Sequence, residues 1–196
     1  MGRKTAPVLG FDLKIDIKRV MDMEKAIGSR VNIHDKEKEL ATEYYQCVAD
    51  ILEDERLQKL ARFTQHAGTS RLQHCLNVSY YSFLMCKVLG WDYRSAARAG
   101  LLHDMYFYDW RRKRCPGLSN HATWHPRVAL DNARKMFPLN EIEKDAILKH
   151  MWPAWLGLPR YKETYIVTLA DKICASMEAV GGKSKKLARF CRGERD

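Results

Sequence analysis

One short stretch constrains this chain more than any other: Ala99-Gly-Leu-Leu-His103-Asp104-Met105, where a histidine and an aspartate directly follow apolar, helix-forming residues. The apolar residues carry these two ionisable side chains toward the interior of the fold. Burying ionisable groups is costly unless they are paired or bind a metal ion. The stretch therefore predicts a helix end that delivers His103 and Asp104 to buried partners.

The same dipeptide occurs once more, as His34-Asp35, so the pair alone does not identify a site. This second copy lies in a polar run, where Asp35 is typical of a helix N-cap. We interpret it as a chance occurrence. The apolar context is what singles out His103 and Asp104.

Bulk properties indicate a single soluble domain. The chain has 196 residues, 46% of them hydrophobic and 30% charged, which is enough for one full core and short for two domains. No apolar run reaches the roughly 20 residues of a membrane span. We also expect no signal peptide and no lipidation, and the six cysteines lack paired spacing. We therefore expect a cytoplasmic protein with reduced thiols and no membrane partner.

Apolar residues recur at helical spacing after residue 35, and strand signals are almost absent there. Residues 11–18 alternate with period two and could form one short strand. We expect helices over about 36–52, 57–65, 70–89, 92–104, 126–136 and 140–151, and a last one that opens at about 165. The predicted fold is all-α: one helical-bundle domain at 36–182, between an N-terminal extension at 1–35 and a basic tail at 183–196.

Local signals refine this outline. Pro126 suits the first turn of its helix, which would put His125 at the helix start. Asn140 and Glu143 resemble a capping box. The small residues before Leu101 favour close approach of a neighbouring helix; they are Ala96, Ala97, Ala99 and Gly100.

Six polar side chains interrupt the apolar helices at intervals of about one helix plus one connection: His74, His103, Asp104, His125, His150 and Asp171. Such spacing lets each helix of a bundle contribute a ligand to one interior point. Imidazole and carboxylate ligands together suit Fe, Mn, Co, Ni or Zn, and the absence of thiolate argues against a structural zinc site. The pattern predicts a catalytic type of metal site.

Each of these residues also has a simpler interpretation. A single buried histidine is more often a hydrogen-bonded core residue, and Asp171 alone could pair with an arginine. His121 lies one helical turn before His125 and could replace it as a ligand. Four tryptophans near the proposed positions suit hydrophobic packing, although one or two could wall a pocket and stack on a flat group. They are Trp110, Trp124, Trp152 and Trp155.

The same residues carry a resemblance to a known family. Arg71-x-x-His74, Leu101-Leu-His103-Asp104, His125-Pro126, His150 and Ala170-Asp171-Lys172-Ile173 resemble the HD superfamily of metal-dependent phosphohydrolases, in particular its small bacterial predicted hydrolases. The resemblance covers about residues 66–180 and implies an HD-type helical bundle.

In the family, the positions that match His74, His103, Asp104 and Asp171 bind one metal ion. The two extra histidines, matched here by His125 and His150, occur in members with a second ion. The branch that cleaves cyclic dinucleotides has a Gly-Tyr-Pro signature, where this chain has Met151-Trp-Pro. That specificity is therefore not carried over.

The ligand chemistry and the resemblance predict the same reaction. One divalent transition metal ion (Fe, Mn, Co or Ni), or a pair bridged by Asp104, would activate water for attack on phosphorus. Arg71 lies on the same helix face as His74 and could hold a phosphate through its fork of donors. We expect catalytic roles for Asp104, Arg71 and Lys172, and substrate-binding roles for Arg71, Arg111 and Arg112.

The net charge of +10 indicates attraction to anions. The expected partner is a phosphorylated small molecule or nucleotide, and nucleic acid is less favoured. Two other functions use the same features. One, which the resemblance also implies, is a di-iron oxygenase with the same six ligands. The other is a non-catalytic module in which a structural metal site supports nucleotide or nucleic-acid binding.

Overall fold

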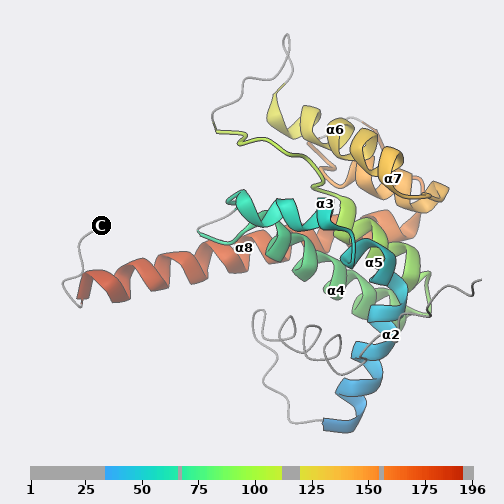
Figure 1. Cartoon of the computed structure of the whole chain (residues 1–196), viewed down its shortest axis with the longest axis horizontal. Helices are drawn as coiled ribbons and strands as arrows, with labels where there is room; N and C mark the ends of the chain where they lie inside the picture. Colours follow the sequence, from blue (N-terminus) through green and yellow to red (C-terminus); the bar gives the residue numbers. More distant parts are fainter. Residues whose placement is uncertain (1–33, 66–67, 112–119, 155–156, 192–196) are drawn as a thin grey trace, which may run out of the picture. The chain divides into compact units, whose positions relative to one another are not determined.

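A computed structural model of the protein describes residues 34–65, 68–111, 120–154 and 157–191; at 34–38 and 182–191 the description covers the backbone alone. The described residues form α-helices and one 3-10 helix and contain no strand (Figure 1). In chain order these are α2 (His34–Leu52), α3 (Glu55–Gln58), η1 (Lys59–Arg62), α4 (Arg71–Leu89), α5 (Tyr93–Leu102), α6 (His121–Met136), α7 (Glu141–Lys149) and α8 (Lys162–Cys191). The predicted all-α fold is confirmed.

The chain divides into two compact units, Met1–Thr42 and Glu43–Asp196. The boundary lies inside α2, later than the position 35 expected from the sequence. The backbone of α8 continues from the expected domain through 183–191, the first part of the basic tail. The possible strand at 11–18 lies outside the described residues.

Helix α5 is central to the second unit. It packs against α4, α7 and α8, while α8 also runs along α4, and α6 packs on α7 (Figure 1). Fully buried apolar side chains from these helices form the core, among them Val78, Phe83, Ala97, Leu101, Ile147 and Val167. The described cysteines Cys47, Cys75, Cys86 and Cys174 are free and buried in this unit.

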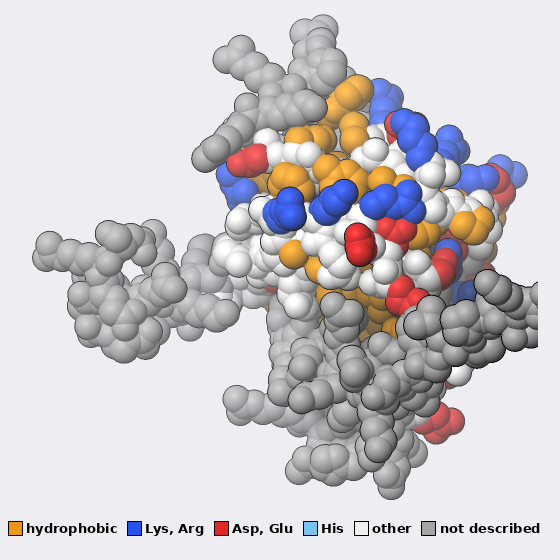
Figure 2. Space-filling model, viewed as in Figure 1, with side chains coloured by type: hydrophobic (Ala, Val, Ile, Leu, Met, Phe, Trp, Pro, Cys, Tyr) orange, Lys and Arg blue, Asp and Glu red, His pale blue; other side chains and the backbone are white. Residues whose placement is uncertain are grey.

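The surface agrees with the charge of the chain. On the face seen in Figure 2, lysine and arginine side chains form a row across the described part of the molecule. None of the described helices combines the length and the apolar character that a membrane crossing requires.

Short capping signals fix the helix ends. The Ser70 side chain accepts a hydrogen bond from the Gln73 N–H at the start of α4, and Gly90 ends α4 at a φ of 65°. The expected capping box is present in α7, where Asn140 and Glu143 satisfy each other's backbone N–H groups.

Several predicted helix boundaries are wrong, and the largest error is at the start of α6. Helix α6 begins at His121 because the Asn120 side chain caps it, accepting a bond from the Thr123 N–H at 3.0 Å. Pro126 is therefore inside the helix, and His121 and His125 lie on successive turns of one helix face.

The helix expected over 57–65 ends at Arg62, and a bridge between Thr64 and Ser70 follows it.

The small residues of α5 allow the close approach to α4 that the sequence predicts. A Cβ added at Gly100 would lie 2.8 Å from the Cα of Ser79, closer than side chains pack. The Ser79 hydroxyl donates to the Ala97 carbonyl at 2.6 Å across the same interface. This contact sets the depth at which α5 carries His103 into the interior.

We therefore expect Gly100→Ala to push α4 and α5 apart and lower the free energy of unfolding by about 1–3 kcal/mol. Gly181→Ala is the matched control, because the added Cβ on α8 meets nothing within 4 Å, and alanine there should stabilise the helix by up to about 1 kcal/mol. Equilibrium unfolding in urea measures the free energy of unfolding of both variants. Equal stability of the two variants would contradict this account of the interface.

Candidate metal centre

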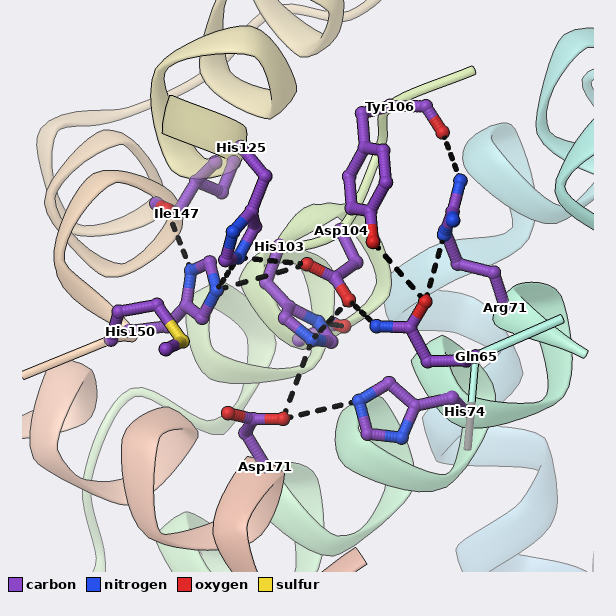
Figure 3. Close-up of polar contacts among 12 residues, drawn as sticks. Gln65, Arg71, His74, His103, Asp104, Tyr106, His125, Ile147, His150 and Asp171 are labelled. Atoms are coloured by element: carbon purple, nitrogen blue, oxygen red, sulfur yellow. Dashed lines mark hydrogen bonds and ion pairs between the residues drawn. The ribbon is translucent and has the colours of Figure 1, made fainter. Parts of the chain in front are cut away.

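The structure brings all six predicted ligands into one buried group, which we call the His/Asp cluster (Figure 3). His74 comes from α4, His125 from α6 and Asp171 from α8, and the others follow the ends of α5 and α7. The six side chains are His74, His103, Asp104, His125, His150 and Asp171, and none is more than 7% exposed. Two sets of ligand atoms within 4.8 Å of one another could hold a metal ion: His74 with His103 and Asp171, and His103 with Asp104 and His150.

Three of the rings are anchored through Nδ1 to backbone carbonyls. The pairs are His103 with Gly100 O at 2.7 Å, His125 with His121 O at 2.7 Å, and His150 with Ile147 O at 2.9 Å. A carbonyl oxygen only accepts, so each Nδ1 must carry the hydrogen. In its neutral form, each ring then presents an unprotonated Nε2.

These Nε2 atoms converge on Asp104. From its Oδ1, His125 Nε2 lies at 3.3 Å and His150 Nε2 at 3.7 Å, while His103 Nε2 lies 3.7 Å from Oδ2. The two Nε2 atoms of His125 and His150 are only 2.8 Å apart. Facing lone pairs at this distance repel each other unless a cation lies between them.

A metal ion suits this arrangement better than a proton. Burial lowers the pKa of His150 to about 3 and also lowers the pKa of His125, so both rings are neutral at pH 7. Two nitrogens bound at right angles to one ion, each at about 2.1 Å, lie about 3 Å apart. His103 Nε2 and Asp104 Oδ1 are buried without a hydrogen bond among the described residues. The residues therefore fit a divalent ion.

Asp104 is held as a carboxylate in a fixed orientation. Burial raises its pKa, but the surrounding rings of His103, His125 and His150, when protonated in acid, bring the pKa well below its usual range. Its Oδ2 accepts a 2.5 Å hydrogen bond from Gln65 Nε2, which leaves Oδ1 facing the rings.

Gln65 is a site residue that the sequence did not reveal. Its Oε1 accepts from Arg71 Nε at 2.9 Å and from the Tyr106 hydroxyl at 3.2 Å. These donors fix the amide with Nε2 toward Asp104. No spacing or motif marks this glutamine, because the Thr64–Ser70 bridge brings it into place.

The expected role of Arg71 as a phosphate clamp needs correction. The side chain is 0% exposed, and its guanidinium lies 3.6 Å from the Tyr106 ring centre. Besides Gln65, its nitrogens donate to the carbonyls of Tyr106 at 2.6 Å and Tyr108 at 3.3 Å. Arg71 therefore holds the 106–108 segment and Gln65, and its fork is directed to the protein rather than outward.

His74 differs from the other rings because carboxylates contact both of its nitrogens. Nε2 lies 3.1 Å from Asp171 Oδ1, and Nδ1 lies 3.1 and 3.2 Å from the Glu178 oxygens. Burial lowers the pKa of His74, but these two carboxylates outweigh burial and raise it to about 10. Glu178 was missed by sequence reasoning, although it lies on the face of α8 that carries Asp171, about two turns further on.

Of the remaining predicted residues, Lys172 is at the rim of the cluster. Its Nζ donates to Asp171 Oδ2 at 2.9 Å and to the His150 carbonyl at 3.4 Å, and its side chain is 46% exposed.

Arg111 donates to the carbonyls of Thr64 and Gln65 at 3.2 and 3.0 Å. Arg112 lies outside the described residues.

His125, not His121, is the ring that faces Asp104. His121 stacks on His125 at 4.5 Å and on Trp110 at 5.1 Å, between the cluster and that indole. Burial lowers the pKa of His121 to about 4. Trp152 packs edge-on to Tyr165, while Trp155 lies outside the described residues.

Comparisons with protein-family models, with curated proteins and with solved structures found no match for this chain. The side chains of the cluster therefore define the chemistry that it can support. Their nitrogen and oxygen donors, without sulfur, suit Fe, Mn, Co, Ni or Zn.

The two neighbouring rings of α6 provide a test of the ligand set. Loss of a side chain that hydrogen-bonds to a metal ligand weakens metal binding roughly 10–100-fold. We expect His125→Ala, which removes a ligand itself, to weaken binding of Mn²⁺ at least as much. His121→Ala should change the Kd little. Isothermal titration calorimetry measures both, and a greater loss in His121→Ala would contradict the assignment.

Proposed function

We propose that the protein is a metal-dependent hydrolase of phosphate esters, acting on a phosphomonoester or nucleotide. The observation that carries this proposal is the convergence of three anchored Nε2 atoms on the Asp104 carboxylate, within a buried group that has no thiolate ligand. When bound, a divalent transition metal ion supplies activated water and neutralises charge on phosphoryl oxygens. The resemblance to the HD superfamily supports the same chemistry.

The six residues of the His/Asp cluster would hold one or two ions. His74, His103 and Asp171 suit one position, with Asp104 as a further ligand. Asp104 is also suited to bridging, because its Oδ1 faces the rings of His125 and His150, while Oδ2 lies nearer His103.

Other side chains would orient the ligands and the substrate. Arg71 and Gln65 keep Asp104 in place through consecutive hydrogen bonds. Lys172 has a half-exposed side chain whose ammonium group lies next to Asp171, so it is suited to bind a phosphoryl oxygen that enters from the surface. Trp110, stacked on His121, offers a flat apolar group near the same cluster.

Asp104→Asn tests the proposal directly, because it keeps the shape of the side chain and removes its charge. We expect loss of both bound metal and turnover when purified protein is analysed for metal and screened against phosphate esters with Mn, Co, Ni, Fe and Mg. A variant with full metal occupancy would contradict the ligand assignment.

A wild-type activity that requires oxygen would favour the di-iron oxygenase, and salt-sensitive oligonucleotide binding without turnover would favour the binding module.

Lys172→Gln tests the role of the rim ammonium. Loss of one charge-assisted hydrogen bond, worth about 1.5 kcal/mol, should lower kcat/KM for the best substrate of that screen on the order of tenfold, with metal content unchanged. Lys135→Gln is the control, since Lys135 pairs with exposed Asp131 on α6. Equal kcat/KM in the two variants would exclude Lys172 from substrate binding.

A further inference from the structure

Glu178 is a buried carboxylate beside the His/Asp cluster with no part in the proposed ligand set. It is 4% exposed. Both of its oxygens lie within 3.2 Å of His74 Nδ1, and Oε1 also accepts from Asn77 Nδ2 at 3.0 Å. Asn77 is held in turn by Gln73, which donates to its Oδ1 at 2.8 Å. The carboxylate is therefore fixed from α4 while it contacts the ring.

The Nδ1 partner of His74 is chemically different from those of the other rings. His103, His125 and His150 donate to neutral backbone carbonyls, whereas His74 contacts an acidic side chain. Asp171 and Glu178 lie about two turns apart on one face of α8. One helix thus places a carboxylate at each nitrogen of the same imidazole.

We propose that Glu178 is a positioning residue of the metal centre, which makes His74 a stronger ligand than its neighbours. By accepting the Nδ1 hydrogen, the carboxylate directs Nε2 toward the ion position shared with His103 and Asp171 and raises the electron density of the ring. Partners of this kind orient metal-bound histidines and increase their basicity. The inference rests on the metal site of the proposed function, and it concerns binding of the ion rather than the reaction.

A purely structural carboxylate would behave differently. It would stabilise the packing of α4 against α8, but its loss would leave the affinity and the ligand field of a bound ion unchanged. Co²⁺ distinguishes the two roles, because its visible absorption reports the ligands around the ion and its Kd can be measured by titration.

The experiment compares full-length wild-type protein with Glu178→Ala, Glu178→Gln and the control Glu163→Gln. Glu163 is also a buried carboxylate of α8, but it accepts from the Asp92 N–H. We expect Glu178→Ala to raise the Kd for Co²⁺ roughly 10–100-fold and to change its absorption bands. Glu178→Gln should fall between wild type and Glu178→Ala because the amide oxygen still accepts from Nδ1, and Glu163→Gln should match wild type.

Wild-type affinity and spectrum in a folded Glu178 variant would overturn the inference while leaving the proposed metal site intact. If Glu178→Ala does not fold, the same outcome in Glu178→Gln overturns it. An equal loss of affinity in Glu163→Gln would also overturn it, since the effect would then be one of general stability. Failure of the wild-type protein to bind Co²⁺ would overturn both the metal site and the role of Glu178.

Discussion

The candidate site depends on one repeated interaction, the hydrogen bond from a histidine Nδ1 to a backbone carbonyl of its own helix. Three rings are held in this way, and in each the carbonyl fixes which nitrogen carries the hydrogen. The Nε2 atoms are then directed at Asp104, where two of them face each other at 2.8 Å. Without these anchors the rings could turn or change tautomer, and the same residues would form an ordinary buried hydrogen-bond network.

Helix ends supply two of the three anchors. His103 and His150 follow the last residues of α5 and α7, and they bond to Gly100 O and Ile147 O. The last carbonyls of a helix have no N–H partner within it, so a histidine at that position can satisfy one of them. The close packing of α5 on α4, which Gly100 permits, brings one of these ends to His74. The ends of α5 and α7 and the packing of α5 on α4 therefore together determine how these histidine side chains are oriented.

Much of this could be predicted from the sequence, and the rest has a physical reason for being missed. Helical periodicity gave the all-α fold, and regular spacing gave the six residues that meet in the cluster. The predicted start of α6 is wrong because Pro126 is typical of a first helical turn, whereas the Asn120 side chain caps the helix. Arg71 was expected to face a phosphate, but periodicity gives only its helix face and not the carbonyls that occupy its donors. Gln65 reaches Asp104 through a chain reversal that leaves no pattern in the sequence.

The proposed function requires that the His/Asp cluster binds a metal ion. The most direct measurement is anomalous X-ray diffraction from crystals of the protein grown with Mn²⁺ or Co²⁺. We expect an anomalous peak inside the cluster, about 2.1 Å from the Nε2 atoms of His125 and His150. Ion-saturated crystals with no peak there, and with the two imidazoles turned apart or joined by a proton, would contradict it.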